Sequence, residues 1–270
     1  MIIPVAQRLQ QVEEYYFSKK LQEVRSMNAQ GLDVINLGIG SPDLPPADEV
    51  VEGLYQSAKN EEHHGYQPYR GTAQLRASMA RWYEATFGVN LEADQQVLPL
   101  MGSKEGIFHI SMAFLNPGDQ VLIPNPGYPG YAGTTKLVGA EPVYYPLDEQ
   151  REWQPDWAYL DNLDTQGIKI MWINYPHMPT GALAQLDTFK RLIEWTKSRS
   201  ILLCHDNPYS LILTNTVLHS IVESFLFLAH HHDSTFLFSR YFLGTITLSS
   251  SFVPRNFQTF FVELSFQFKG

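Results

Sequence analysis

Apolar residues in the first part of the chain recur with the spacing of amphipathic helices. Between residues 5 and 30 they return every three to five positions, and Gly31 follows, which predicts one helix that ends there. A second helix is predicted over about 47–59. A third follows Thr72, a residue type that caps helix N-termini, and Gly88 is placed to end it.

From residue 95 onward, short apolar runs alternate with helical patterns. The predicted strands are 33–38, 95–100, 120–124, 141–146, 168–174 and 201–205, with helices between most of them. Such alternation is typical of βαβ units, and therefore of a parallel sheet with helices on both faces. The predicted fold class is α/β, a three-layer αβα domain with a mainly parallel sheet. Ligands of such sheets bind at the carboxyl ends of the strands.

Composition narrows the range of partners. The chain has 270 residues, of which 44% are hydrophobic and 17% charged, and its formal net charge is −9. A negative balance argues against a nucleic-acid or anionic-membrane partner. No signal peptide and no membrane span are expected. The single cysteine, Cys204, forms no intrachain disulfide and fits a reducing cytoplasm.

The character of the chain changes near residue 214. Residues 214–270 hold only six charged side chains, but they hold eleven of the sixteen phenylalanines. We therefore predict three parts: an N-terminal helical segment over 1–31, a main domain over 32–213, and an atypical tail over 214–270. A histidine run at 230–232 can bind metal in principle, but we predict no metal site.

The loop after 95–100 combines small residues with a positive charge. Gly102, Ser103 and Lys104 open a predicted helix, whose first N–H groups have no partner inside the helix and whose dipole favours an anion. This arrangement indicates a phosphate site. The alternative is an ordinary tight turn between strand and helix.

Three further loops follow predicted strands. Tyr128, in NPGYPGY, could stack on a flat ring or could be a packed turn residue. The segment YPHMPTGA is a rigid loop that could line a pocket. Asp206 ends an apolar strand, where a carboxylate is costly without a partner such as a protonated ring nitrogen. Tyr209 could then bond a ring oxygen, whereas the alternative is that Asp206 only caps the next turn.

Six segments in a fixed order carry a family resemblance. NLGIGSPD, YQPYRGTAQLR, GSKEG, NPGYPGY, YPHMPTGA and HDNPYS together resemble the class I/II, fold-type-I aminotransferases that use pyridoxal 5′-phosphate. The resemblance covers roughly residues 5–213. It implies amino-group transfer between an amino acid and a 2-oxo acid, with 32–213 as the cofactor-binding large domain. Aspartate, alanine, methionine and diaminopimelate all remain possible amino donors.

The resemblance also implies a role for individual residues at the cofactor's phosphate. Gly102, Ser103 and Lys104 match the turn that binds the phosphate. Tyr66 matches a tyrosine that reaches the cofactor phosphate of the neighbouring subunit, so the resemblance implies a homodimer.

Other matches concern the cofactor ring and the substrate. Tyr128 matches the aromatic residue that stacks on the pyridine ring, and Asp206 matches the aspartate that pairs with the ring nitrogen. Tyr209 matches the tyrosine that contacts the ring's phenolic oxygen. Gly40 lies in the turn that touches the α-carboxylate of the substrate.

Two departures from the family pattern qualify the expected activity. Met178 stands where the family usually has an asparagine that contacts the phenolic oxygen. The family also needs a Schiff-base lysine in a Ser-x-x-Lys setting, yet of nine lysines only Lys269 follows Asp206, outside such a setting. The expected later arginines have no match, since Arg240 and Arg255 lie in unrelated contexts.

We therefore expect a truncated chain, without the C-terminal small domain, whose tail arose by a reading-frame shift. A diverged tail that folds on its own terms is the alternative. Without the lysine, we predict no transferase activity. Two alternatives to an aminotransferase remain: a remnant that holds pyridoxal phosphate without catalysis, and a pyridoxal-phosphate lyase on the same fold.

Overall fold

The computed structural model describes residues 3–11, 16–38, 40, 44–212, 236–238 and 260–265. The chain forms two compact units, one before Tyr66 and one from Tyr66 to Gln267. The two units are defined by contacts within the molecule, which do not test where a family domain begins or ends. The expected boundaries at 31/32 and 213/214 therefore stay predictions.

The first unit is helical. Its elements are η1 (Gln7–Gln11), α1 (Tyr16–Ala29), α2 (Asp48–Lys59) and η2 (Glu61–His64). No residue of α1 or α2 is buried. The predicted helix over 5–30 is thus a 3₁₀ segment followed by an α-helix, and residues 12–15 lie outside the described chain. Residues 32–37 carry no regular secondary structure, so the prediction of a strand at 33–38 was wrong.

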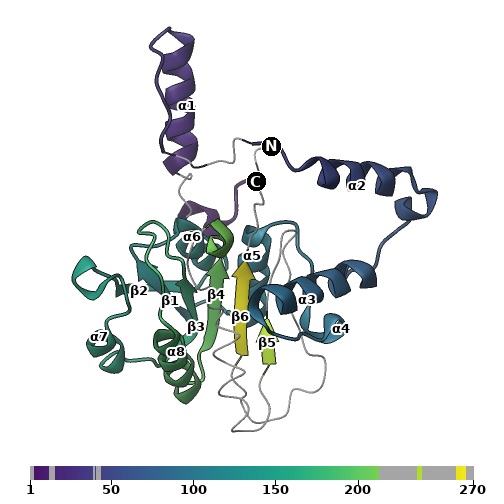
Figure 1. The fold of residues 1–270 in the computed structure, drawn as a ribbon. Coiled ribbons are helices and arrows are strands. Elements are labelled where there is room, and N and C mark those ends of the chain that lie inside the picture. The colour runs from purple at the N-terminus through teal and green to yellow at the C-terminus, as the bar shows by residue number, and fades with distance from the viewer. Residues whose placement is uncertain are drawn as a thin grey trace. The chain divides into compact units, whose positions relative to one another are not determined.

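The second unit is built on a six-stranded sheet (Figure 1). Its strands are β1 (Gln120–Asn125), β2 (Glu141–Pro146), β3 (Ile168–Asn174), β4 (Leu202–Asn207), β5 (Phe236–Phe238) and β6 (Phe260–Ser265). The strand order is β2-β1-β3-β4-β6-β5, and every neighbouring pair is parallel. The predicted parallel sheet is confirmed.

Six α-helices and two short 3₁₀ turns accompany the sheet in the described part of this unit. They are α3 (Ala73–Phe87), α4 (Ala93–Gln96), α5 (Ser103–Phe114), α6 (Pro129–Leu137), α7 (Trp157–Asp161), α8 (Leu186–Ser198), η3 (Glu149–Arg151) and η4 (Ser210–Ile212). Thr72 Oγ1 accepts the Leu75 N–H at 3.2 Å, and Gly88 ends α3 at φ +69°. Both predicted ends of α3 are confirmed.

The predicted strand at 95–100 was wrong for residues 95 and 96, which are helical, and in the rest of this range a β-bridge is assigned only at residue 99. The Glu92 carbonyl accepts the N–H groups of Gln95 and Gln96 at 3.0 and 2.8 Å, which closes the short helix α4. Only after this turn does the chain extend toward Ser103. The apolar residues at 97, 98 and 100 are too few to extend as a strand once the polar residues before them are helical.

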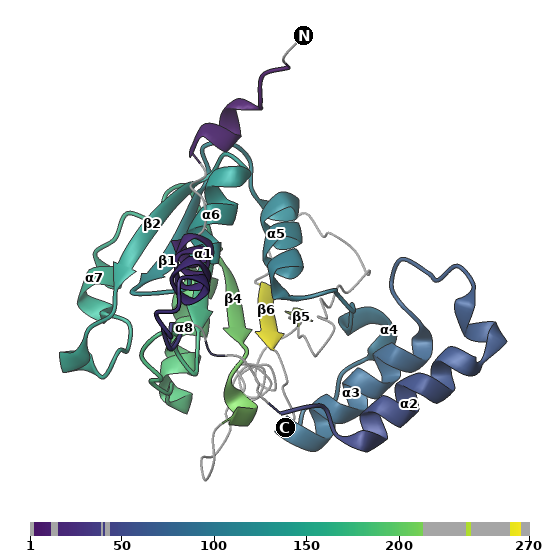
Figure 2. The same ribbon diagram turned by 90° about the horizontal axis from the view of Figure 1, so that it is seen from above.

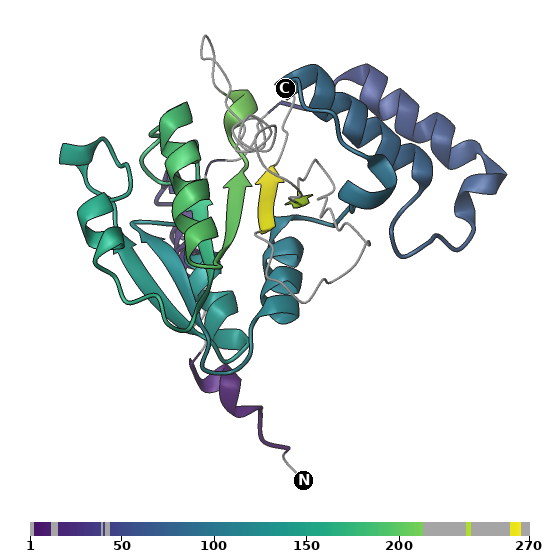
Figure 3. The same cartoon turned by 90° about the horizontal axis from the view of Figure 1, so that it is seen from below.

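Alternate strand residues face two separate clusters of buried side chains. Leu122, Met171 and Leu203 lie in a cluster with side chains of α3, α7 and α8. Residues 121, 170 and 202 lie in a second cluster with side chains of α5 and α6. Because successive strand side chains point to opposite faces, the sheet is the middle of three layers. Figures 2 and 3 show α5 and α6 on one face and α8 on the other.

Two strands come from the predicted tail. β6 pairs with β4, with Leu264 opposite Asp206 and Ser265 opposite Asn207, and β5 pairs with β6. The rest of the tail, including the histidine run, Arg240, Arg255 and Lys269, lies outside the described residues.

Cys204 is a free, buried thiol in β4. Within the described ranges no helix is long and apolar enough to cross a membrane. In the same part of the chain no three His, Cys, Asp or Glu side chains come together as metal ligands.

Candidate functional site

The parallel strands β1, β3 and β4 end at one edge of the sheet, which we call the carboxyl edge. Its strand-end residues are Asn125, Asn174 and Asn207. Asp206 lies opposite Asn174 in the β3–β4 register and is 5% exposed. A buried carboxylate at this position requires hydrogen-bond donors.

Tyr131 supplies one such donor. Its hydroxyl donates to Asp206 Oδ2 at 2.7 Å, from the first turn of α6 to the end of β4. Burial, followed by the charge of Asp206, raises the pKa of Tyr131 well above the ordinary value of 10.0. The phenol therefore keeps its proton at physiological pH and acts as a donor.

The ring of Tyr131 is fixed by its neighbours. It stacks on Trp172, with centroids 5.0 Å apart and planes 6° apart. Tyr128 meets it edge-on at 5.4 Å. The Thr135 hydroxyl donates to the Tyr131 carbonyl at 2.8 Å, which also fixes the backbone. The ring of Tyr128, a predicted site residue, is thus next to the Tyr131–Asp206 pair.

Asn174 joins the end of β4 to the loop after β3. Its Nδ2 donates to the Asp206 carbonyl at 2.6 Å, and its Oδ1 accepts the Met178 N–H at 2.7 Å. Asn174 is 2% exposed. One amide side chain therefore sets the backbone of Asp206 relative to that of Met178.

Met178 contacts a second predicted site residue. The Tyr209 hydroxyl donates to Met178 Sδ at 3.4 Å. A thioether accepts hydrogen bonds weakly. The structure thus brings Tyr209 and position 178 together, as the resemblance implies for the tyrosine and the usual asparagine.

The predicted anion turn lies at the start of α5. Gly102 has φ +111°, a conformation that favours glycine, and a Cβ added at Gly102 would meet no atom within 4 Å. Ser103 begins the helix and is 9% exposed, whereas Lys104 is exposed. The first N–H groups of α5 have no partner within the helix. α5 packs on the same face of the sheet as α6.

For two further predicted site residues, the structure describes the local surroundings. Tyr66 is 87% exposed, and its ring meets Tyr69 edge-on at 6.4 Å. Gly40 belongs to the first unit, and a Cβ added there would meet no atom within 4 Å. Their roles at the site stay predictions.

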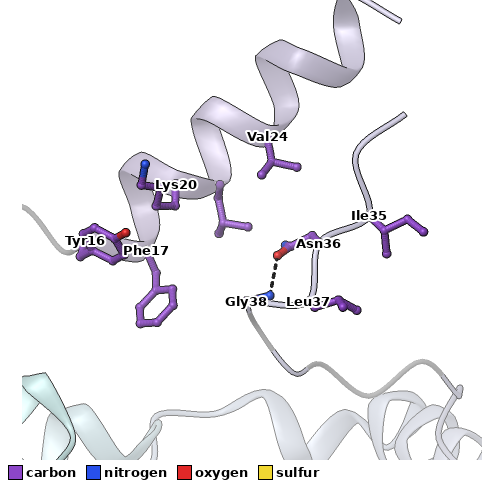
Figure 4. Close-up of a pocket in the computed structure, with 9 residues that line it drawn as sticks. Tyr16, Phe17, Lys20, Val24, Ile35, Asn36, Leu37 and Gly38 are labelled. Atoms are coloured by element: carbon purple, nitrogen blue, oxygen red, sulfur yellow. Dashed lines mark hydrogen bonds between the residues drawn. The ribbon is translucent and has the colours of Figure 1, made fainter. Parts of the chain in front are cut away.

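A pocket of about 320 Å³ lies in the first unit, between α1 and residues 35–38 (Figure 4). The Gly38 N–H donates to Asn36 Oδ1 at 2.9 Å in its lining. Ile35 and Leu37 are 80% and 90% exposed. None of the predicted site residues lines this pocket.

Tyr131 and Asn174 were not predicted from the sequence. Both lie in or beside the motif segments, since Tyr131 is the second tyrosine of NPGYPGY and Asn174 ends the strand before YPHMPTGA. A buried-strand asparagine and a second tyrosine three residues after Tyr128 were the available signals. Neither signal indicates that the residue forms a hydrogen bond with Asp206.

The groups at the carboxyl edge, together with those at the start of α5, suit a flat, phosphorylated nitrogen heterocycle. Asp206 offers a buried carboxylate for a ring nitrogen, Tyr209 a phenol for a ring oxygen, and Tyr128 an aromatic face. The start of α5 offers N–H groups and the Ser103 hydroxyl for a phosphate.

Comparison with curated proteins finds relatives over most of this chain. The LL-diaminopimelate aminotransferase of Dehalococcoides mccartyi is 41% identical over 206 residues, which are 76% of this chain and 53% of that protein. The enzyme of the same name from Aquifex aeolicus is 39% identical over 207 residues, 77% of this chain and 54% of that protein. The chain spans about half the length of the curated relatives it matches.

Solved structures agree on the fold. BacF from Bacillus subtilis matches with a TM-score of 0.78 and is 33% identical in sequence. The match covers 82% of this chain and 57% of BacF. Alanine aminotransferase from Pyrococcus furiosus has a TM-score of 0.74 at 29% identity, over 81% of this chain and 56% of that one.

The aminotransferase class I and II family matches residues 32–243, beyond the last of the six motif segments. Pyridoxal 5′-phosphate is the cofactor of this family. On these grounds the chain belongs to the aminotransferase class I and II family.

Proposed function

We propose that this chain comes from a lineage of pyridoxal-phosphate-dependent aminotransferases and holds the cofactor at the carboxyl edge. The observation that carries the proposal is Asp206, a buried carboxylate whose side chain is bonded by Tyr131 and whose backbone is bonded by Asn174. When bound, the cofactor supplies an electron sink for the α-carbon of an amino acid.

Each residue at the edge has a task toward this cofactor. Asp206 would keep the ring nitrogen protonated, because a nearby negative charge favours the cationic form. Tyr209 would donate to the phenolic oxygen, and the ring of Tyr128 would cover the pyridine face. The turn of Gly102, Ser103 and Lys104 would hold the phosphate.

Two further tasks need the complete assembly. Tyr66 would contact the phosphate bound by a second copy of the chain, which makes a homodimer the proposed state. Its 87% exposure supports a residue that serves another subunit. Gly40 would contact the α-carboxylate of the substrate. A cytoplasmic location completes the proposal and rests on the single reduced cysteine.

LL-Diaminopimelate is the proposed amino donor of the lineage, and a 2-oxo acid is the acceptor. The support is the name shared by the curated relatives at 36–41% identity. Diaminopimelate carries two amino and two carboxylate groups, so its recognition needs cationic or amide donors beyond the carboxyl edge.

For this chain itself, we propose that binding is non-covalent and that transfer is not completed. The covalent step needs a lysine near the ring, and Lys269 is the one lysine that follows Asp206 in the sequence. Lys269 comes a few residues after β6, the strand paired with β4.

The test combines binding with chemical trapping. The purified chain is titrated with pyridoxal 5′-phosphate, reduced with borohydride, and mapped by peptide mass spectrometry. We expect saturable binding that dialysis reverses and no adduct at a specific lysine. Asp206→Asn should weaken binding about tenfold or more, and Asp187→Asn, at a 92% exposed side chain, should not.

Two results would contradict these proposals separately. No saturable binding by the unchanged chain would overturn the cofactor site. A stoichiometric adduct at Lys104 or Lys269 would overturn the non-covalent proposal.

A further inference from the structure

We propose that Tyr131 is a positioning residue that aims the Asp206 carboxylate at the ring nitrogen of the cofactor. This inference rests on the proposed function. It adds a residue that would act through Asp206 rather than touch the cofactor.

A short buried hydrogen bond joins the two side chains. Tyr131 Oη and Asp206 Oδ2 are 2.7 Å apart, and the two residues have exposures of 0% and 5%. A hydrogen bond to an ionised acceptor is about twice as strong as one between neutral groups. In a buried site the bond fixes the rotation of the carboxyl group as well as its position.

The donor of this bond is itself held in place. The Tyr131 ring lies flat against Trp172, at 5.0 Å and 6°, and Trp172 is fully buried. Thr135 holds the Tyr131 backbone carbonyl at 2.8 Å. A donor fixed at ring and backbone gives the carboxylate one orientation.

Asp206 is held at two points. Asn174 holds its backbone carbonyl at 2.6 Å, and Tyr131 holds Oδ2. With the backbone and one carboxylate oxygen fixed, the direction of the other oxygen is determined. We assign to Tyr131 the role of setting this direction, rather than a role in the stability of the fold.

The chain offers a matched control for the loss of a buried phenol. Tyr145 is also buried, and its hydroxyl donates to the carbonyl of the same Trp172 at 2.8 Å. Its hydroxyl serves the backbone and not Asp206. Tyr131→Phe and Tyr145→Phe therefore remove equivalent hydroxyls with different predicted consequences for the ligand.

The experiment compares two ligands on the full chain. Pyridoxamine 5′-phosphate has the ring nitrogen and no aldehyde, so it cannot react with surface lysines. Its analogue with carbon in place of the ring nitrogen lacks the group that Asp206 would bind. Dissociation constants for both ligands are measured by calorimetry, and urea unfolding shows that each variant is folded.

We expect the unchanged chain to prefer pyridoxamine phosphate over the carbon analogue. Tyr131→Phe should weaken the binding of pyridoxamine phosphate about tenfold and leave the affinity for the carbon analogue unchanged. Tyr145→Phe should leave the ratio of the two affinities unchanged. If Tyr131→Phe does not fold, 3-fluorotyrosine at position 131 keeps the ring and should still alter only the pyridoxamine phosphate affinity.

The outcomes separate this inference from the proposed function. Equal weakening of both ligands, or no weakening, would overturn the positioning role while the cofactor site stands. An unchanged chain that binds neither ligand, or binds both equally, would overturn the assigned role of Asp206 and this inference with it.

Discussion

Asn174→Ala tests whether one side chain holds the carboxyl edge together. The substitution removes the bond from Nδ2 to the Asp206 carbonyl and the bond from the Met178 N–H to Oδ1. It leaves the buried Asp206 carbonyl and the partly buried Met178 N–H without their side-chain partners. Each buried group left in this way costs about 1–3 kcal/mol.

We therefore expect the free energy of unfolding to fall by about 2–4 kcal/mol, below the sum of the two upper limits because water can enter the space left by the amide. The assay is urea unfolding followed by tryptophan fluorescence and by circular dichroism. Asn162→Ala is the control, since Nδ2 of the exposed Asn162 donates to a carbonyl within its own helical turn at 2.8 Å. That variant should lose less than about 1 kcal/mol.

The same Asn174→Ala variant should also weaken cofactor binding, because Met178 and Asp206 lose their common support. A loss of stability no larger than that of Asn162→Ala would refute the reasoning, since it would mean that the two bonds contribute little. If stability falls by the expected amount but cofactor binding is unchanged, only the link from Asn174 to the site is refuted.

Three further substitutions probe single groups. Met178→Asn gives Tyr209 an amide in place of a thioether, and we expect pyridoxamine phosphate to bind up to about tenfold more tightly; weaker binding in titrations would contradict this. Burial lowers the pKa of His177 below its ordinary value of 6.5, so the folded state resists protonation, and stability is lost as pH falls below about 6.5. His177→Gln should flatten that loss in urea midpoints measured at falling pH, and an unchanged slope would exclude His177 as its cause. Gly102→Ala forces a side chain into φ +111° and should cost about 1–2 kcal/mol in urea unfolding, whereas Gly53→Ala, inside a helix, should not destabilise.

Local sequence patterns predicted the structure correctly where the hydrogen-bond partners of a residue are also its neighbours in sequence. The cap of α3 at Thr72 and its left-handed end at Gly88 depend on bonds that span three or four residues. The predicted strand at 95–100 shows the limit of such patterns. Its apolar residues favoured a strand, but the polar residues before them formed the short helix α4 instead.

The sequence by itself determined the parallel α/β sheet and the loops in which several candidate residues lie, because alternation of strands and helices is a local property that also fixes where each loop emerges. Only the tertiary structure decided what holds Asp206. Tyr131 is 75 positions away from it and Asn174 is 32 away. Their contacts depend on the register of β3 against β4 and on the rotation of α6 over the sheet, which no spacing in the sequence specifies.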